Sequence, residues 1–323
     1  MKAKAILITG GLGYLGGRMA TFLKEKHPDT EIILTTRREN RPRWADHFKI
    51  VQMDLGHLNG EMDWLNGVDV MIHLASMHQE DCAKDPKKAF EINTIGFYDL
   101  LGAALKKDVR HVIYFSTFHV YGTPGNNVLT EDSPTCSFHP YAYTHRAAED
   151  VVNYFSHYKN IHSIIFRGSN GYGYPMDMDV SQWMLVFNDF CRQAVTTQKI
   201  IINSSGKQHR NVISLEDMAR AVEYFLFDPE YVWQNEIYNL AGEGSMSIYE
   251  IAEKVAERYE RKYNENIKEI VVKDERNLVE EGLPVRISTE KLKKTGFRLK
   301  GNMALEIDKT LEICEGFVRG NHL

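Results

Sequence analysis

The chain has 323 residues, of which 43% are hydrophobic, so it can bury a large core in one α/β domain or in two closely packed ones. Its 39 basic and 44 acidic residues are intermingled and give a net charge of -5, without a charged block that would attract nucleic acid or an anionic membrane. We therefore expect a globular protein that binds neither nucleic acid nor membranes.

The cysteines are Cys82, Cys136, Cys191 and Cys314, and their wide spacing is typical of reduced thiols rather than of a metal site. We expect no metal. The apolar run near residue 5 is too short for a signal peptide, and no later run approaches about 18 apolar residues. These features predict a cytoplasmic protein.

Short apolar runs alternate with longer amphipathic segments through the first half of the chain. Continuous apolar strands indicate burial on both faces, and the alternation is typical of a doubly wound parallel sheet of the Rossmann type. The predicted strands are 5–10, 31–36, 48–54, 68–75, 111–117, 162–170 and 236–242. The predicted helices between them include 15–26, 88–107 and 140–159.

The pattern becomes less regular after residue 170, which indicates a smaller C-terminal lobe. A capping box at Ser247 and Glu250, a strand at 268–273 and a basic helix at 288–295 belong to this part. We predict a dinucleotide-binding domain over 1–170, with a returning segment at about 211–241. Residues 171–210 and 242–323 would form the substrate-binding lobe, with a cleft between the two.

The first predicted strand leads into "TGGLGYLGG" and then directly into a helix. Gly10, Gly13 and Gly16 permit a tight turn, a close approach of a pyrophosphate and close helix packing, with the phosphate at the helix N-terminus. Together with Tyr14 and Leu15 they predict a dinucleotide-binding turn, although a simple glycine-rich turn is the alternative.

The end of the second strand distinguishes the two nicotinamide dinucleotides. An acidic residue there would bind the adenosine 2′-hydroxyl, whereas an arginine would bind a 2′-phosphate. Here Thr35 and Thr36 are followed by Arg37 and Arg38, which favours NADP, with NAD still possible. The alternative is a solvated basic loop.

Two more strand ends fit the same cofactor. Asp54 could accept a hydrogen bond from the adenine amino group, with Leu55 beside it. Leu74 and Ala75, in "HLAS", would let the cofactor pass close to the backbone.

The chain resembles the extended short-chain dehydrogenases/reductases, or NAD-dependent epimerase/dehydratase family, most of which act on nucleotide sugars. The resemblance covers nearly the whole chain. It rests on motifs in the family's order: "TGGLGYLGG", "MDL", "HLAS", "EINTIGFYDLL" with Asn93, "FSTFHVYG", "YAYTHRAAE", "RGSNGYGYP", "GKQHRNVISLEDMARAV" and "YNLAGEG". The resemblance implies the fold, an NAD(P) cofactor bound in part by Asn93, a nucleotide-sugar substrate and a homodimer formed by helices near 92–107 and 141–157.

The resemblance also implies a catalytic set of a tyrosine, a lysine four residues later and a threonine or serine on the preceding strand. Tyr141 and Thr117 match two of these positions. A phenol with a pKa of about 10 needs help to exchange a proton with a sugar oxygen, and a cation one helical turn away favours the phenolate. An ordinary helix tyrosine and strand threonine are the alternatives.

His145 departs from the family's lysine. A histidine at this position still faces Tyr141 and can bind the nicotinamide ribose, but an imidazole with a pKa of about 6.5 is mostly neutral at pH 7. Two explanations remain open: an enzyme that activates Tyr141 differently, and a regulatory or degenerate protein that binds NADP with little turnover. The retained Thr117, Tyr141 and glycine turn favour the enzyme.

Family dehydratases carry Asp-Glu directly after the strand threonine, whereas this chain has Phe118 and His119. Elimination of water would lack its acid and base. Sugar epimerisation and net reduction of a 4-keto-sugar remain, and the arginines of the second strand favour reduction. A carbonyl reductase acting on a substrate other than a sugar is a further alternative.

The resemblance assigns three residues to the nucleotide sugar. Arg210 and Arg286 match arginines that bind the diphosphate, and Asn170 matches an asparagine that contacts the sugar nucleotide. One guanidinium group can bind two phosphate oxygens at once, so two converging arginines would form a diphosphate site. Surface ion pairs are the alternative for both.

Overall fold

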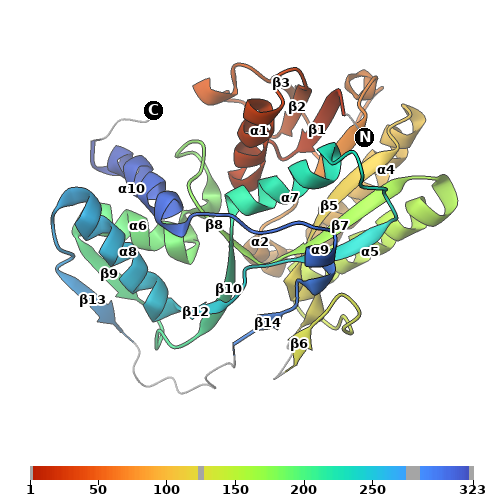
Figure 1. The fold of residues 1–323 in the computed structure, drawn as a ribbon. Helices are drawn as coiled ribbons and strands as arrows, with labels where there is room; N and C mark the ends of the chain where they lie inside the picture. Colours follow the sequence, from red (N-terminus) through yellow and green to blue (C-terminus); the bar gives the residue numbers. More distant parts are fainter. Residues whose placement is uncertain (1–2, 123–126, 274–283, 320–323) are drawn as a thin grey trace.

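A seven-stranded parallel sheet forms the centre of the molecule (Figure 1). The computed structural model describes residues 3–122, 127–273 and 284–319. The strand order is β11-β7-β5-β4-β1-β2-β3, which confirms the predicted doubly wound fold. The strands are β1 Ala5–Thr9, β2 Glu31–Thr36, β3 Lys49–Gln52, β4 Val70–His73, β5 His111–Thr117, β7 His162–Gly168 and β11 Glu236–Leu240.

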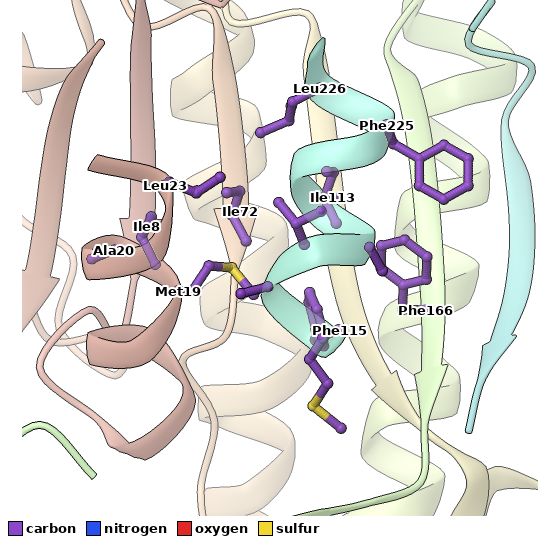
Figure 2. Close-up of a cluster of buried hydrophobic side chains, with 14 of the residues drawn as sticks. Ile8, Met19, Ala20, Leu23, Ile72, Ile113, Phe115, Phe166, Phe225 and Leu226 are labelled. Carbon is purple, nitrogen blue, oxygen red and sulfur yellow. The ribbon is translucent and has the colours of Figure 1, made fainter. Parts of the chain in front are cut away.

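Helices cover both faces of this sheet because successive strand residues point to opposite sides. Ile6 and Ile8 of β1 pack against one core and Leu7 packs against the other. Figure 2 shows Met19 and Leu23 of α1 near Ile72, and Phe225 of α7 near Phe166, over the first face. This face is covered by α1 Tyr14–Lys26 and α7 Leu215–Phe227, and the other by α3 Pro86–Phe90, α4 Phe97–Lys106 and α5 Pro140–Lys159.

The predicted helix over 88–107 is confirmed from α3 through α4, and its middle forms a π-helical turn, η3 Glu91–Gly96. Gly96 lies so close to the Leu55 carbonyl that a Cβ there would be 2.2 Å from the oxygen. The wider turn directs the Asn93 side chain inward, where it accepts from the Met77 N–H and donates to the Thr144 hydroxyl.

A second core lies in the C-terminal half, where α6, α8 and α10 pack together. Its capping box at Ser247 and Glu250, the strand at 269–272 and the helix at 290–294 confirm the elements predicted there. The helices are α2 Gln79–Lys84, α6 Val186–Thr197, α8 Ile248–Tyr263, α9 Glu290–Lys294 and α10 Met303–Arg319. The remaining strands are β6 Val128–Leu129, β8 Asn170–Tyr172, β9 Lys199–Ile202, β10 His209–Ser214, β12 Ser245–Ser247, β13 Glu269–Val272 and β14 Arg286–Ile287. Short 3-10 turns are η1 Arg43–Ala45, η2 Asp63–Leu65, η4 Phe118–Tyr121 and η5 Ser181–Met184.

Two further features concern the cysteines and the length of the helices. All four cysteines are free, with Cys136 exposed and the others buried. In the part of the chain that the structure describes, no helix combines the length and the apolar character that crossing a bilayer requires.

A buried ion pair joins α1 to α10. The Arg18 guanidinium donates to both Glu306 oxygens, each at 2.8 Å, and the Glu306 side chain is only 1% exposed. The Tyr174 N–H also donates to Glu306, while its ring lies 3.4 Å from the guanidinium carbon of Arg18. Each charge thus has several partners, which a buried charge requires.

We expect Glu306→Gln to lower the free energy of unfolding by roughly 3–5 kcal/mol, because it leaves the Arg18 charge buried without a counterion. The matched control is Glu312→Gln, which removes an exposed carboxylate that pairs with Lys262 and Lys309 and should cost less than about 1 kcal/mol. Urea unfolding at pH 7 measures both. Equal losses in the two variants would contradict the central role of this pair.

Candidate active site

Two adjoining cavities lie at the carboxyl ends of the central strands. The sheet order reverses between β1 and β4, so the chain leaves these strands in opposite directions and opens a crevice between them. The first cavity has a volume of about 470 Å³ and the second about 680 Å³. They share the lining residues Tyr14, Leu15, Leu74, Ser76, His78, Tyr141, Ser181 and Gln182.

The glycine turn forms the floor of the first cavity, and all five of its predicted residues, Gly10, Gly13, Tyr14, Leu15 and Gly16, line it. Gly10 has a φ of +66°, and a Cβ on Gly16 would lie 2.3 Å from the Gly10 carbonyl oxygen. No side chain caps the N-terminus of α1, so its first backbone N–H groups can bind an anion. This turn fits a pyrophosphate.

Arg37 and Arg38 also line the first cavity, but their surroundings differ. The Arg38 guanidinium pairs with Asp177 and Asp179, which sequence reasoning did not anticipate. Arg37 is exposed and forms no ion pair with any residue that the structure describes. Only Arg37 therefore has its charge free for a further ligand.

The other strand ends complete the first cavity. Asp54 and Leu55 lie on one side, and Leu74 and Ala75 lie beside the glycine turn. A hydrogen bond from the Gly56 N–H, together with His57 and Arg37, lowers the pKa of Asp54, so this carboxylate is an acceptor at neutral pH.

Asn93 is not among the residues that line either cavity, and the contact with a cofactor that its motif implied stays a prediction. It is buried beneath the first cavity and bonds Met77 and Thr144. These bonds support α5 and the residues after β4.

The second cavity contains Thr117 and His145, and Tyr141 lies where the two cavities meet. Thr117 ends β5, and its hydroxyl oxygen accepts from the His119 N–H. Tyr141 lies in the first turn of α5, where Pro140 and the capping ring of His139 fix the start of the helix. The helical spacing places the His145 ring 4.5 Å from that of Tyr141.

Burial raises the pKa of Tyr141 to about 12, and the facing Thr117 hydroxyl opposes this rise only in part. The same cause acts oppositely on His145, because burial disfavours the imidazolium and lowers its pKa to about 4. At pH 7 both side chains are therefore neutral, and Tyr141 holds its proton.

Tyr114 orients the imidazole of His145. The Tyr114 hydroxyl and the His145 Nδ1 are 2.8 Å apart, and both residues are buried. The other ring nitrogen, Nε2, is buried and has no partner within the described chain. With Tyr114 donating to Nδ1, the proton lies on Nε2, which is then a donor for a ligand in the second cavity.

The hydroxyl of Ser116, the residue before Thr117, already has a hydrogen-bond partner within the protein. Ser116 donates to the Glu149 carboxylate at 2.5 Å, and Arg167 pairs with the same carboxylate. Glu149 and Arg167 are buried, so this network is closed within the protein. Thr117 is therefore the hydroxyl at this strand end with hydrogen-bonding capacity left for a ligand.

The two residues after Thr117, Phe118 and His119, line the second cavity and carry no carboxylate. Burial, with a smaller contribution from Arg210, lowers the pKa of His119 to about 4. Neither side chain is thus charged at pH 7.

The residues expected to bind a diphosphate are only partly brought together. Asn170 lines the second cavity and donates to the Asn211 carbonyl. Arg210 and Arg286 are exposed and line neither cavity. Ser245 links the segments that carry them, because it pairs with Asn211, next to Arg210, and donates to the Val285 carbonyl, next to Arg286.

Sequence reasoning missed two parts of this site. Tyr114 is a buried strand residue, and only the packing of α5 shows that it contacts His145. Residues 179–182 complete the first cavity from the segment after β8, and no periodic pattern marks such a segment. Within the described residues, no group of three or more His, Cys, Asp or Glu side chains could hold a metal ion.

Residues 6–241 of the chain match the NAD dependent epimerase/dehydratase family. Among curated proteins, the chain is 27% identical over 327 residues to the dTDP-D-glucose 4,6-dehydratase of Mus musculus. This alignment covers 96% of the chain and 88% of the mouse protein.

Solved structures share the fold. The UDP-N-acetylglucosamine 4-epimerase of Methanobrevibacter ruminantium, in complex with UDP-N-acetylmuramic acid, has a TM-score of 0.80 and 21% identity, covering 99% of this chain and 100% of that one. RMD from Pseudomonas aeruginosa, complexed with NADPH, has a TM-score of 0.79 and 21% identity, covering 97% and 99%. At this identity the likeness shows the fold alone.

Proposed function

Because the chain belongs to the NAD-dependent epimerase/dehydratase family, we propose that it is an NAD(P)-dependent nucleotide-sugar oxidoreductase, a 4-keto-sugar reductase or a sugar epimerase. One observation carries this proposal: Tyr141 lines both cavities, with Thr117 beside it in the second. The first cavity fits a dinucleotide, so Tyr141 would lie between coenzyme and substrate.

The proposed roles follow from the protonation states. When bound, the coenzyme supplies or accepts a hydride at its nicotinamide ring. Tyr141, with a pKa of about 12, is protonated at neutral pH and can donate its proton to a carbonyl oxygen. The Thr117 hydroxyl can bind the same oxygen and orient it. Donation to a carbonyl is the reducing direction, so the site supports reduction more directly than oxidation.

The proposal retains NADP as the preferred coenzyme, with NAD possible. Arg37, which lines the first cavity, is the arginine without an ion pair in the described chain. The unpartnered Nε2 of His145, beside Tyr141 where the two cavities meet, would bind the nicotinamide ribose. Dehydration is not proposed, although the mouse relative is a dehydratase, because Phe118 and His119 stand in place of the Asp-Glu pair and the neutral His119 carries no acidic proton to act as a general acid.

The substrate proposal concerns the C-terminal lobe, residues 171–210 and 242–323. Asn170 in the second cavity, and Arg210 and Arg286 on segments that Ser245 links, would bind the sugar nucleotide and its diphosphate. A carbonyl compound other than a nucleotide sugar is the alternative, and full activity after Arg210→Ala would favour it.

A second candidate is a coenzyme-binding protein with little or no turnover, whose occupancy regulates a partner. The neutral His145 favours it, because Tyr141 lacks the nearby cation that would stabilise a phenolate.

We expect Tyr141→Phe to lower turnover by roughly 10²–10⁴-fold, because it removes the proton donor without changing the shape of the site. Proton NMR with NADPH or NADP and a panel of 4-keto-hexose and hexose nucleotides would follow product formation. Tyr143→Phe is the matched control, since Tyr143 lies two residues away, stacks on Phe90 and lines neither cavity. Binding of coenzyme without any turnover in the unsubstituted protein would instead support the second candidate.

We expect His145→Lys to change the pH dependence of the oxidising direction. With a pKa of about 12 for Tyr141, the phenolate fraction at pH 8 is about one in 10⁴ and rises tenfold per pH unit, so the rate should rise likewise. An added cation lowers this pKa by about one to three units and should raise the rate at pH 8 by roughly 10-fold or more.

In the unsubstituted protein the reducing direction should stay nearly independent of pH below 9, because Tyr141 remains protonated there. His145→Gln is the control that keeps a hydrogen-bond donor but adds no charge. A pH–rate profile that is the same in the lysine and glutamine variants would rule out this account of Tyr141.

We also propose a homodimer formed through α4 and α5. Large apolar side chains are exposed on this surface, including Ile95 at 54% and Tyr158 at 70%, and the Tyr98 and Tyr154 rings stack across the two helices. Such a surface is typical of a covered helix face.

Light scattering of the purified protein should give the mass of a dimer, and Ile95→Glu with Tyr98→Glu should give a monomer, because buried unpaired charges are costly. Val232→Glu, at a residue exposed to 68% on another part of the molecule, should remain dimeric. A monomeric unsubstituted protein would contradict the proposed dimer.

A further inference from the structure

The segment between β8 and α6, residues 173–185, crosses from the C-terminal half to the first cavity and is here called the strap. At its start the Gly173 carbonyl accepts from the Tyr14 hydroxyl at 2.6 Å. Near its end the Ser181 hydroxyl lies 2.7 Å from the His78 Nε2. The strap is thus attached to the glycine turn at one end and to the residues after β4 at the other.

Carboxylates in the middle of the strap hold Arg38. Arg38 Nη1 donates to the two Asp177 oxygens at 3.3 and 3.2 Å, and Nη2 donates to Asp179 at 3.3 Å. The Trp44 indole N–H donates to Asp177 at 2.7 Å. The Asp177 side chain is 10% exposed and the Arg38 side chain 23%, so this contact is screened from water on most sides.

This contact lies where the adenosine ribose of a dinucleotide is recognised. Arg38 follows directly after the end of β2, and both Arg38 and Asp179 line the first cavity. A 2′-phosphate at this position would need a guanidinium and would meet two carboxylates already bound to it. A 2′-hydroxyl would meet no such repulsion, since it carries no charge.

We propose that Asp177 and Asp179 are specificity-determining residues, which compete with a coenzyme 2′-phosphate for Arg38 and so reduce the preference for NADP over NAD. The inference rests on the proposed coenzyme binding. Arg37, which has no ion pair in the described chain, supplies the attraction that remains for the phosphate.

The strap also connects coenzyme choice to the substrate cavity. Ser181 and Gln182 line both cavities, and Met184 and Leu185 line the second. A phosphate that takes Arg38 from the strap therefore acts on a segment that also forms a wall of the substrate cavity.

The test compares the dissociation constants of NADPH and NADH, measured by nicotinamide fluorescence at low salt. In Asp177→Asn with Asp179→Asn we expect NADPH to bind roughly tenfold more tightly and NADH to change by less than about twofold. Asp179→Asn alone, at a side chain exposed to 64%, should give a smaller change in the same direction and carries little risk to folding.

Two control variants isolate the contact. Asp46→Asn removes an exposed carboxylate two residues from Trp44 that has no contact with Arg38, and it should change both constants equally. The second control starts from Arg38→Met. In this background, replacing Asp177 and Asp179 by Asn should tighten NADPH binding by less than about threefold, because the guanidinium for which they and the phosphate compete is absent.

The outcomes separate this inference from the proposed function. If both coenzymes bind but the ratio of their constants is the same with and without the carboxylates, the inference is wrong and the coenzyme assignment stands. If neither coenzyme binds to any of the proteins, the coenzyme assignment is wrong, and the inference is wrong with it.

Discussion

The buried ion pair between Arg18 and Glu306 is the contact on which the candidate site depends. It fixes α10 on α1, directly beside the glycine turn, and Glu306 also binds the Tyr174 N–H at the start of the strap. Both cavities have walls from the two halves of the chain, because the strap lines them opposite the strand ends. Paired and fully hydrogen-bonded charges hold this geometry more specifically than apolar packing would, since they accept few alternative arrangements.

One physical cause, removal from water, sets the protonation states of Tyr141 and His145. Burial raises the pKa of Tyr141 to about 12 and lowers that of His145 to about 4, because in each case it disfavours the charged form. Tyr141 and His145 are therefore both neutral at pH 7, unlike a tyrosine paired with a lysine. A neutral phenol next to an oriented imidazole suits proton donation to a carbonyl, and the phenolate needed for oxidation must come from high pH or from a ligand's charge.

The sequence was sufficient for most of the fold. The apolar runs gave all seven central strands, since strands buried on both faces are continuous and bounded by turns. The helix expected over 88–107 is present, but its middle turn at 91–96 is π-helical, which meets the requirement that Gly96 lie close to the Leu55 carbonyl and that Asn93 point inward. Helical periodicity does not reveal that requirement, which arises from a neighbouring strand end.

By itself, the sequence determined the doubly wound sheet, the glycine turn and the positions of Thr117 and Tyr141, because these depend on local pattern and on helical or strand spacing. Only the tertiary structure decided which of these groups keep a free charge or a free hydrogen bond. Arg38 is paired by Asp177, and His145 is oriented by Tyr114, through contacts between residues 139 and 31 positions apart. These two contacts depend on which segments the folded chain brings together, and burial then sets the charge of the side chains involved. Neither the contacts nor the charges could be predicted from the order of residues alone.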